Sequence, residues 1–387
     1  MKADPIARLC LSVVEVTAKT RWIFLEIETG AGLRGTGEAT LPGREDAVLG
    51  VARELAPWML GLADSVPWGR GAPVPGSLPE AAVVSALDHA LWDVHAARQG
   101  RPVADVLGTR QRSLIPLYAN INRRTRDRSP EGFAASALAA VAAGFDAIKI
   151  APFDEVTPDA HRAGTVPAML APGLQRIAAV RAALGPGRDL LVDCHWRLDE
   201  AAAATVVGAA AAQDVYWVEC PLPETEANLP ALKRLRGLAN VRGMRLAGRE
   251  EGVGLADFAP FLAAGAYDVM MPDVKYVGGL AEMLHLAERF AAHGVAFSPH
   301  NPTGPVCHAA SLHLAAVAAG FDRLEMQFDE TPLFAALVGD ALPQPHAGCS
   351  ALPGMARGLG ASLVEDVVTR HRVARFERRR SDIAASC

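Results

Sequence analysis

One pattern dominates the chain from about Ser113 onward: short apolar runs alternate with alanine-rich segments that are long enough to form helices. The apolar runs read LIPLYANI, DAIKIA, DLLVDCH, VYWVEC, MRLAGRE, YDVMMPD, VAFSPH and RLEMQF. Runs of this length predict buried strands, and intervening segments such as GFAASALAAVAAG predict helices. Strand–helix alternation repeated over all eight runs favours a closed parallel β/α barrel, with an open doubly wound sheet as the alternative.

The first hundred residues have a different pattern, in which predicted strands come first and predicted helices follow. LCLSVVEV and RWIFLEIET read as two strands, and a short third strand ends in GTGEATL. Two helices are predicted after them, EDAVLGVARELAPWMLG and PEAAVVSALDHALWDVHAARQG. We therefore expect an α+β domain over residues 1–112 and the barrel over 113–330. The last segment, 331–387, is expected to pack back on the first domain.

A glycine-rich segment, GAGLRG (Gly30–Gly35), matches the spacing of dinucleotide-binding loops. Such a loop needs a helix that begins at its third glycine, because the helix N-terminus binds the pyrophosphate. Here the chain continues into TGEATL instead. The segment is therefore predicted to be a hairpin turn.

Composition narrows the class of protein. Half of the 387 residues are hydrophobic, and the net charge is −5 with both signs interspersed, so we expect no nucleic-acid binding. The run Arg378–Arg380 is interpreted as a solvated tail. The six cysteines form no C-x-x-C pair, which is typical of reduced thiols in a cytoplasmic protein. We see no export signal and no apolar stretch of about 18 residues, so no membrane association is expected.

Polar side chains occur at the ends of nearly all the predicted barrel strands. Because the carboxyl ends of barrel strands meet at one mouth, these side chains are expected to share a pocket. Gathering so many charges costs desolvation and repulsion unless something compensates. The residues are Lys149, Asp193, His195, Glu219, Glu250, Asp273, His300 and Glu325.

A divalent cation is the predicted compensation. Asp193, Glu219 and Glu250 end three consecutive strands, and hard carboxylate ligands favour Mg²⁺ over zinc. The alternative is that one of the three pairs with an arginine such as Arg249. Glu251 is an adjacent competitor for the place of Glu250.

Two histidines are candidates for proton transfer. His300 and Asp273 end adjacent strands, and a carboxylate beside an imidazole fixes its tautomer and raises its basicity, as a general base requires. A purely structural pair is the alternative. If strand geometry continues, His195 lies on the same side as Asp193 while Cys194 points away. His195 could then protonate a leaving hydroxyl, or simply partner Asp193.

Lys149 and Glu325 complete the predicted site. Lys149 could bind the substrate carboxylate or act as a base on the opposite face; a buried salt bridge is the alternative. Glu325, if protonated, could hydrogen-bond a developing enolate; its alternative is a core ion pair.

Taken together, several motifs resemble the enolase superfamily, in its mandelate racemase/muconate lactonizing enzyme-like branch. They are GTGEATL, SALDHALWDVHAARQGRPVADVLG, VDCHW, YWVECPLPE, LAGRE, PDVKYVGG and SPHNPTGP. The resemblance implies an α/β fold: a (β/α)7β-type TIM barrel with an N-terminal α+β capping domain, completed by the C-terminal segment. It also implies Mg²⁺ bound by Asp193, Glu219 and Glu250, with an Asp273–His300 dyad and a strand-eight glutamate, Glu325.

The D-x-H of Asp193 and His195 looks most like the D-galactonate dehydratase group of acid sugar dehydratases, in which that histidine expels the hydroxyl. In two respects the sequence departs from the family. The K-x-K of the second strand is Lys149-Ile150-Ala151 here, which weakens a two-base racemase interpretation. The interval from Glu219 to Glu250 is longer than usual.

The resemblance implies a Mg²⁺-dependent dehydratase of a hydroxylated carboxylic acid. His300 would take the α-proton to form a metal-stabilised enediolate, and loss of the β-hydroxyl would give a 2-keto-3-deoxy acid. Alternatives are a racemase, epimerase or cycloisomerase of a carboxylate, and an inactive sugar-acid-binding relative. We expect a small-molecule carboxylate partner and a homo-oligomer. Specificity is expected in the loops Lys19–Arg21 and Pro42–Asp46, with Arg21, Arg44, Tyr118 and Asn120 as candidate contacts.

Overall fold

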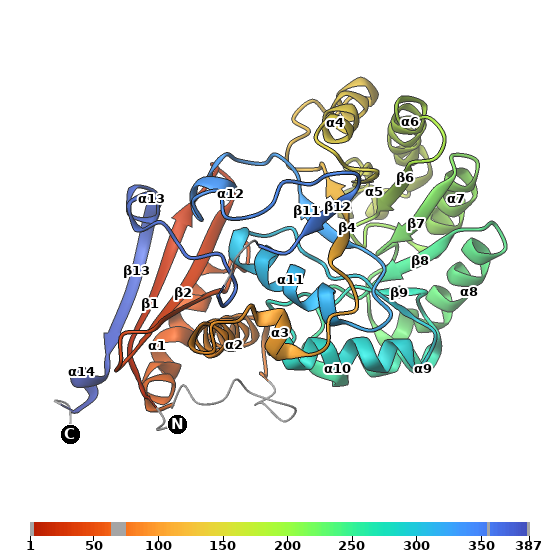
Figure 1. Ribbon diagram of the computed structural model, residues 1–387. Coiled ribbons are helices and arrows are strands. Elements are labelled where there is room, and N and C mark those ends of the chain that lie inside the picture. The colour runs from red at the N-terminus through yellow and green to blue at the C-terminus, as the bar shows by residue number, and fades with distance from the viewer. Residues whose placement is uncertain (1–3, 63–74, 354–356, 385–387) are drawn as a thin grey trace.

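The computed structural model describes residues 4–62, 75–353 and 357–384, which form a sheet-and-helix cap beside a barrel (Figure 1). The antiparallel cap sheet runs in the order β13-β1-β2-β3. Its strands are β1 (Ile6–Glu15), β2 (Arg21–Thr29), β3 (Arg34–Glu38) and β13 (Arg372–Arg379). Helices α1 (Glu45–Gly61) and α2 (Leu78–Arg98) pack on this sheet, so the predicted α+β module is confirmed. The hairpin predicted at Gly30–Gly35 joins β2 to β3.

The side chains of β2 alternate between two cores. Trp22 and Phe24 belong to the core shared with the barrel, whereas Ile23, Leu25 and Ile27 pack in the cluster that contains α1 and α2. Burial on both faces holds the cap sheet between its own helices and the barrel.

Two glycines of the GTGE motif allow α2 to lie directly on β3. A Cβ atom at Gly37 would lie 1.8 Å from the carbonyl oxygen of Ala86, and one at Gly35 would lie 2.1 Å from that of Ala90. Any larger side chain would push the helix away, since atoms cannot approach so closely. The motif is therefore a packing requirement of the cap.

In the described part of the chain, eight parallel strands follow one another in the order β10-β9-β8-β7-β6-β5-β4-β11. They are β4 (Leu114–Asn120), β5 (Ala147–Ile150), β6 (Asp189–Asp193), β7 (Val215–Glu219), β8 (Arg245–Gly248), β9 (Val269–Met270), β10 (Ala296–Phe297) and β11 (Leu324–Gln327). A β-bridge from Phe297 to Phe321, just before β11, joins the two ends of this order. The closed barrel is confirmed, and the open sheet is excluded.

Helices cover the outside of the barrel (Figure 1). The main ones are α4 (Pro130–Ala142), α6 (Val166–Leu184), α7 (Glu200–Ala211), α8 (Leu229–Asn240), α9 (Gly254–Ala264), α10 (Leu280–Ala291) and α11 (Pro305–Val317). Shorter helices are α3 (Val103–Leu107), α5 (Pro158–Arg162) and η1 (Glu226–Asn228). No helix in the described ranges is both long enough and apolar enough to cross a bilayer.

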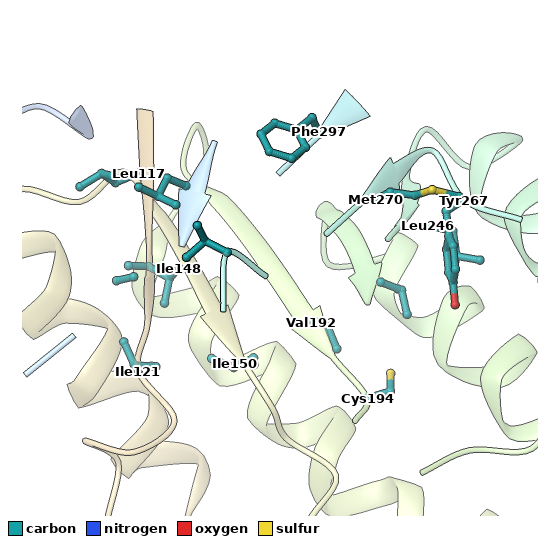
Figure 2. Close-up of a cluster of buried hydrophobic side chains, with 14 of the residues drawn as sticks. Leu117, Ile121, Ile148, Ile150, Val192, Cys194, Leu246, Tyr267, Met270 and Phe297 are labelled. Carbon is teal, nitrogen blue, oxygen red and sulfur yellow. The ribbon is translucent and has the colours of Figure 1, made fainter. Parts of the chain in front are cut away.

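The pleat of the strands decides which residues reach the barrel interior. Figure 2 shows Val192 and Cys194 among the apolar side chains that the strands direct at the surrounding helices. Their neighbour Leu191 lies instead in the interior cluster with Trp217. By the same alternation Asp193 belongs to the interior, so the predicted outward direction of Cys194 is confirmed.

The C-terminal segment returns to both parts of the molecule. It contains α12 (Leu333–Ala336), β12 (Cys349–Ala351), α13 (Glu365–His371) and α14 (Arg380–Ala384). β12, which the sequence did not reveal, pairs with β4, and β13 pairs with β1 to complete the cap sheet. Arg378 and Arg379 belong to that edge strand and Arg380 begins α14, so the run is not a tail, although Arg379 and Arg380 are exposed to solvent.

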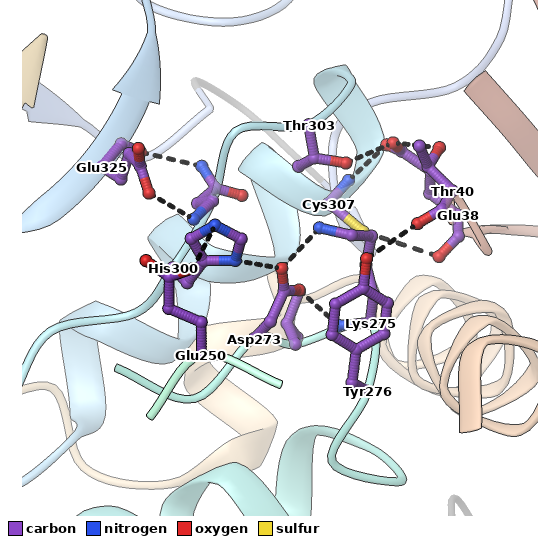
Figure 3. Close-up of polar contacts among 12 residues, drawn as sticks. Glu38, Thr40, Glu250, Asp273, Lys275, Tyr276, His300, Thr303, Cys307 and Glu325 are labelled. Atoms are coloured by element: carbon purple, nitrogen blue, oxygen red, sulfur yellow. Dashed lines mark hydrogen bonds and ion pairs between the residues drawn. The ribbon is translucent and has the colours of Figure 1, made fainter. Parts of the chain in front are cut away.

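A buried carboxylate joins the cap to the barrel. Glu38, at the end of β3, accepts hydrogen bonds from Thr303 Oγ1 at 2.6 Å and from the backbone N–H groups of Gly304 at 2.8 Å and Cys307 at 3.0 Å (Figure 3). These groups lie at the start of α11, where backbone donors lack helical partners. Glu38 therefore fixes the cap against the loop that follows β10.

Candidate active site

Three acidic side chains meet at the barrel mouth. Asp193 ends β6, Glu219 ends β7 opposite it in register, and Glu250 lies two residues beyond β8. One oxygen from each carboxylate lies within 4.8 Å of the others, and all three residues are buried. The structure therefore brings together the predicted metal ligands.

A strained turn directs Glu250 into this cluster. Arg249 has φ of +70°, and its backbone N–H donates to Glu224, whose Oε1 also accepts from Tyr267 Oη at 2.8 Å. The neighbour Glu251 is exposed, so Glu250 and not Glu251 is the third carboxylate of the cluster. The turn, rather than a continued strand, selects the inward carboxylate.

Glu250 lacks the partners that a buried carboxylate normally has. Its Oε1 atom is buried with no hydrogen-bond partner among the described residues. Burial and then the charges of Asp193 and Glu219 raise the pKa of Glu250 well above its usual value. A divalent cation would supply the missing partner and offset the repulsion, so the oxygen-only ligand set fits Mg²⁺.

His300 and Asp273 form the expected pair. His300 Nδ1 lies 2.8 Å from Asp273 Oδ2, and its Nε2 lies 3.5 Å from Glu250 Oε2 (Figure 3). Lys275 Nζ lies 2.6 Å from the same Asp273 oxygen. Burial opposes ionisation of Asp273, but Lys275 and His300 together lower its pKa. An ionised Asp273 holds the proton on Nδ1 and leaves Nε2 directed at the acidic cluster.

His195 reaches the cluster by a different backbone route from the one expected. β6 ends at Asp193, and His195 has φ of +47° in a turn, so the strand does not continue. The ring still returns, because His195 Nε2 lies 2.8 Å from Asp193 Oδ2. The Asp193 charge raises the pKa of His195, whereas burial opposes this. Burial would raise the pKa of Asp193, but the charge and hydrogen bonds of His195, together with the charge of Lys149, lower that pKa to about 2.

Lys149 and Glu325 form a buried ionic group beneath the cluster. Lys149 Nζ lies 2.5 Å from Glu219 Oε1 and 2.9 Å from Glu325 Oε1. Burial would lower the pKa of Lys149, but these two carboxylates raise it well above its usual value. Asn120 and the backbone of Asn301 donate to Glu325. These contacts favour the ionised carboxylate, whereas the suggested hydrogen bond to an enolate requires the protonated one.

A cavity of about 730 Å³ opens beside His195, between the barrel mouth and the cap loop Thr17–Thr20. Lys19 lines it, but Arg21 pairs with Glu15 instead. Arg44 and the loop Pro42–Asp46 do not line this cavity. Tyr118 is buried inside the barrel against Trp217, and Asn120 is occupied by Glu325, so neither reaches the cavity lining.

Sequence reasoning missed Lys275 and Glu224. Lys275 lies two residues after Asp273 in a turn, where the backbone N–H of Tyr276 donates to the Asp273 carbonyl, so no strand period in the sequence points to it. Glu224 acts through the backbone of Arg249, 25 residues away, and no local pattern in the sequence reveals such a contact.

Two family models cover most of the chain. Residues 4–108 match the mandelate racemase/muconate lactonizing enzyme N-terminal domain, and residues 132–367 match the enolase C-terminal domain-like family. The chain belongs to the mandelate racemase/muconate lactonizing enzyme family. The resemblance in the motifs is thereby confirmed.

Members of this family with assigned names include sugar-acid dehydratases. The chain is 32% identical to a D-galactonate dehydratase of Verminephrobacter eiseniae over 303 residues, 76% of this chain and 75% of the relative. It is 30% identical to a D-gluconate dehydratase of Thermoproteus tenax over 304 residues, and spans 57% of that protein's length.

Solved structures of the family share the fold. A mandelate racemase/muconate lactonizing enzyme from Jannaschia sp. CCS1 superimposes with a TM-score of 0.81 at 26% identity, covering 94% of this chain and 96% of that one. One from Sulfitobacter sp. gives 0.82 at 26% identity, with 96% of each chain covered. The cap and barrel of the present protein are thus the arrangement expected of the family.

Proposed function

We propose that this protein is a hydro-lyase that dehydrates a hydroxylated sugar acid to a 2-keto-3-deoxy acid. One observation carries the proposal: two imidazoles flank the acidic cluster, His300 beside Glu250 and His195 beside Asp193. Each ring is oriented by a carboxylate, so each can hold or take a proton at a defined nitrogen. The dehydratase names of the relatives support sugar acids as substrates.

Asp193, Glu219 and Glu250 would hold Mg²⁺. When bound, such a cation supplies the positive charge that binds a substrate carboxylate and makes the neighbouring carbon acid easier to deprotonate. The unpartnered oxygen of Glu250 is the feature of this chain that supports a cation there.

His300 is the proposed base. Asp273 accepts the Nδ1 proton, so Nε2 presents a lone pair toward the acidic cluster and can take the α-proton of the substrate. Lys275 keeps Asp273 charged, which maintains this tautomer through the reaction.

His195 is the proposed acid. Its side chain is 41% exposed and lines the cavity, while the ion pair with Asp193 favours the protonated ring. His195 donates its proton to the β-hydroxyl, which leaves as water when the C–O bond breaks. The electron pair of the broken α C–H bond becomes the new C=C bond, and the resulting enol tautomerises to the 2-keto-3-deoxy acid.

Dehydration accounts for the site better than racemisation. A two-base racemase needs a base on each face, but Lys149 is held as a cation by Glu219 and Glu325. The position two residues after Lys149, just beyond β5, holds Ala151 and not a second lysine. One face therefore has a competent base, and the other has an acid.

The experiment is a screen of sugar acids with and without Mg²⁺, followed by assay of keto acid and by mass spectrometry in deuterated water. Loss of one water with keto-acid formation supports dehydration, and His300→Asn should abolish both keto acid and deuterium exchange. Exchange without loss of mass would assign racemisation or epimerisation instead. Binding of an acid with neither change would mark an inactive relative.

A further inference from the structure

The cavity beside His195 is strongly cationic. The cap loop Thr17–Thr20 forms one wall, and Ala151 and His195 lie on the barrel side. The cap loop is tied down by hydrogen bonds from Thr20 to Glu330 and from Thr331 to the carbonyl of Val16. The charged lining residues are Lys19, Arg123, Arg126, Arg128, Arg197, Asp154 and Glu330.

Both carboxylates of the lining are already paired. The carboxylate of Glu330, on a side chain that is 5% exposed, accepts a hydrogen bond from Arg123 Nη1 at 2.9 Å. The carboxylate of Asp154 accepts one from Arg128 Nε at 2.6 Å. Arg128 has further contacts with the carbonyls of Asn122 and Ala151, so its guanidinium is occupied by the protein. Within each of these two pairs the charges cancel. The other cations of the cavity are left without a compensating negative charge.

Lys19, Arg126 and Arg197 have no carboxylate partner among the described residues. Lys19 and Arg126 are exposed, and their side chains make no hydrogen bond to the described part of the chain. Three like charges around one cavity repel one another, and an anion placed between them would relieve that repulsion.

The guanidinium of Arg197 is fixed in a position from which it can bind such an anion. Its Nη1 atom donates to the carbonyl oxygens of Phe153 at 3.4 Å, Asp154 at 3.1 Å and Val156 at 3.3 Å. The Nε and Nη2 groups have no partner within the described residues, and an arginine fork suits carboxylate or phosphate oxygens. Because Nη1 is anchored, little side-chain entropy is lost on binding.

Arg197 places the positive charge of the cavity close to the proposed acid, His195. It lies two residues after His195, in the turn that also places the proposed acid. A substrate whose carboxylate lies at the acidic cluster and whose β-hydroxyl meets His195 would extend its remaining carbons into the cationic cavity. A neutral terminal hydroxyl would leave the three cations uncompensated there.

We infer that the substrate carries a second acidic group, at the end remote from the reacting carbons, and that Arg197, Arg126 and Lys19 bind this group. The group is a carboxylate, as in an aldaric acid, or a phosphate, as in a phosphorylated aldonic acid. This inference rests on the proposed function for the orientation of the substrate.

The test compares matched acids that differ at the remote end: D-gluconate, D-glucarate and 6-phospho-D-gluconate, with D-galactonate and galactarate as a second series. For each acid kcat/KM is measured, and Kd is measured by calorimetry on EDTA-treated protein. We expect the acids with a remote acidic group to exceed the matching aldonic acids in kcat/KM and in affinity by about ten- to hundredfold, as charge-assisted hydrogen bonds predict. Preference for 6-phospho-D-gluconate over D-glucarate assigns phosphate, and the reverse assigns carboxylate.

Arg126→Gln should lower the ratio of an acid with a remote acidic group to its matching aldonic acid about tenfold. The double variant Arg126→Gln/Arg197→Gln should lower the same ratio about a hundredfold. Arg126→Gln removes no contact within the described protein, so it tests the subsite even if the double variant is unstable. Arg242→Gln, exposed at the opposite end of the barrel before β8, is the matched control and should keep the ratio.

A wild-type ratio near one, or an equal loss in Arg242→Gln, overturns the inference. If no acid gives a keto acid but the Kd ratio still falls in Arg126→Gln, the proposed function fails and the anion subsite stands. If aldonic acids are dehydrated and neither ratio responds to the variants, the function stands and the subsite fails.

Discussion

The ammonium group of Lys275 lies 2.6 Å from Asp273 Oδ2, the same oxygen that orients the imidazole of His300. Both partners of this ion pair are buried, so Asp273 depends on Lys275 to stay charged. Lys275 therefore acts on the proposed base through Asp273, without itself reaching the acidic cluster.

We predict that Lys275→Met lowers kcat about a hundredfold, because a neutral Asp273 no longer holds the proton on Nδ1 of His300 with Nε2 free to act as the base. Loss of the lysine charge raises the pKa of Asp273, so the rate should recover as pH rises, which a merely structural role would not produce. Breaking the buried pair should also cost about 3 kcal/mol of unfolding free energy. pH–rate profiles check this, with exposed Lys233→Met as control; an unshifted profile contradicts it.

Glu224 supports the backbone turn that directs Glu250 inward. It accepts the N–H of Arg249, whose φ is +70°. Glu224→Gln should weaken Mg²⁺ binding about tenfold or more, because groups that orient metal ligands contribute to affinity. Titration calorimetry with Mg²⁺ measures this. The matched control is Glu226→Gln, exposed on η1, and an equal Kd in both variants would refute the positioning role.

Replacing Glu250 should separate stability from activity. Without a cation, Glu250 is buried beside two other carboxylates with one oxygen unpartnered, so Glu250→Gln should raise the melting temperature of EDTA-treated protein. The same variant should lose activity and the stabilisation by Mg²⁺, which for a wild-type site at about 100 times Kd is about 2.7 kcal/mol. Exposed Glu251→Gln should change none of these values. Mg²⁺ stabilisation that persists in Glu250→Gln would remove this residue from the ligand set.

Much of this site follows from sequence because strand alternation and strand ends are local properties. Asp193 and Glu219 end two neighbouring strands, and the period of two places them inward. Glu250 and His195 are different, because residues with positive φ at Arg249 and His195 turn them into the cluster, and tertiary contacts such as that of Glu224 stabilise such turns.

Long-range pairing is the other part that the sequence hides. The arginine-rich segment of β13 has the charge of a solvated tail, yet its backbone pairs with β1, more than 360 residues earlier in the chain. Arg197 likewise looks like an ordinary surface charge until the carbonyls of a neighbouring loop fix its guanidinium.

Buried neutral histidines should make the protein sensitive to acid. Burial lowers the pKa values of His89, His308 and His313 to about 4, from about 6.5 in the unfolded chain. Their contribution to the free energy of unfolding is complete above pH 6.5. It is lost as pH falls toward 4, because over that interval only the unfolded chain gains the protons. Each of these histidines can lower the free energy of unfolding by about 3 kcal/mol between pH 6.5 and pH 4.

His89→Gln tests this prediction at one position. The glutamine amide can replace the hydrogen bond from His89 Nε2 to the carbonyl of Val274 but cannot titrate. The fall in unfolding free energy between pH 6.5 and pH 4, measured by urea denaturation, should therefore be about 3 kcal/mol smaller in this variant. Exposed His293→Gln is the matched control and should keep the wild-type slope. Equal slopes in the two variants would show that His89 gains its proton in the folded state as well, and would contradict the effect expected from its burial in α2.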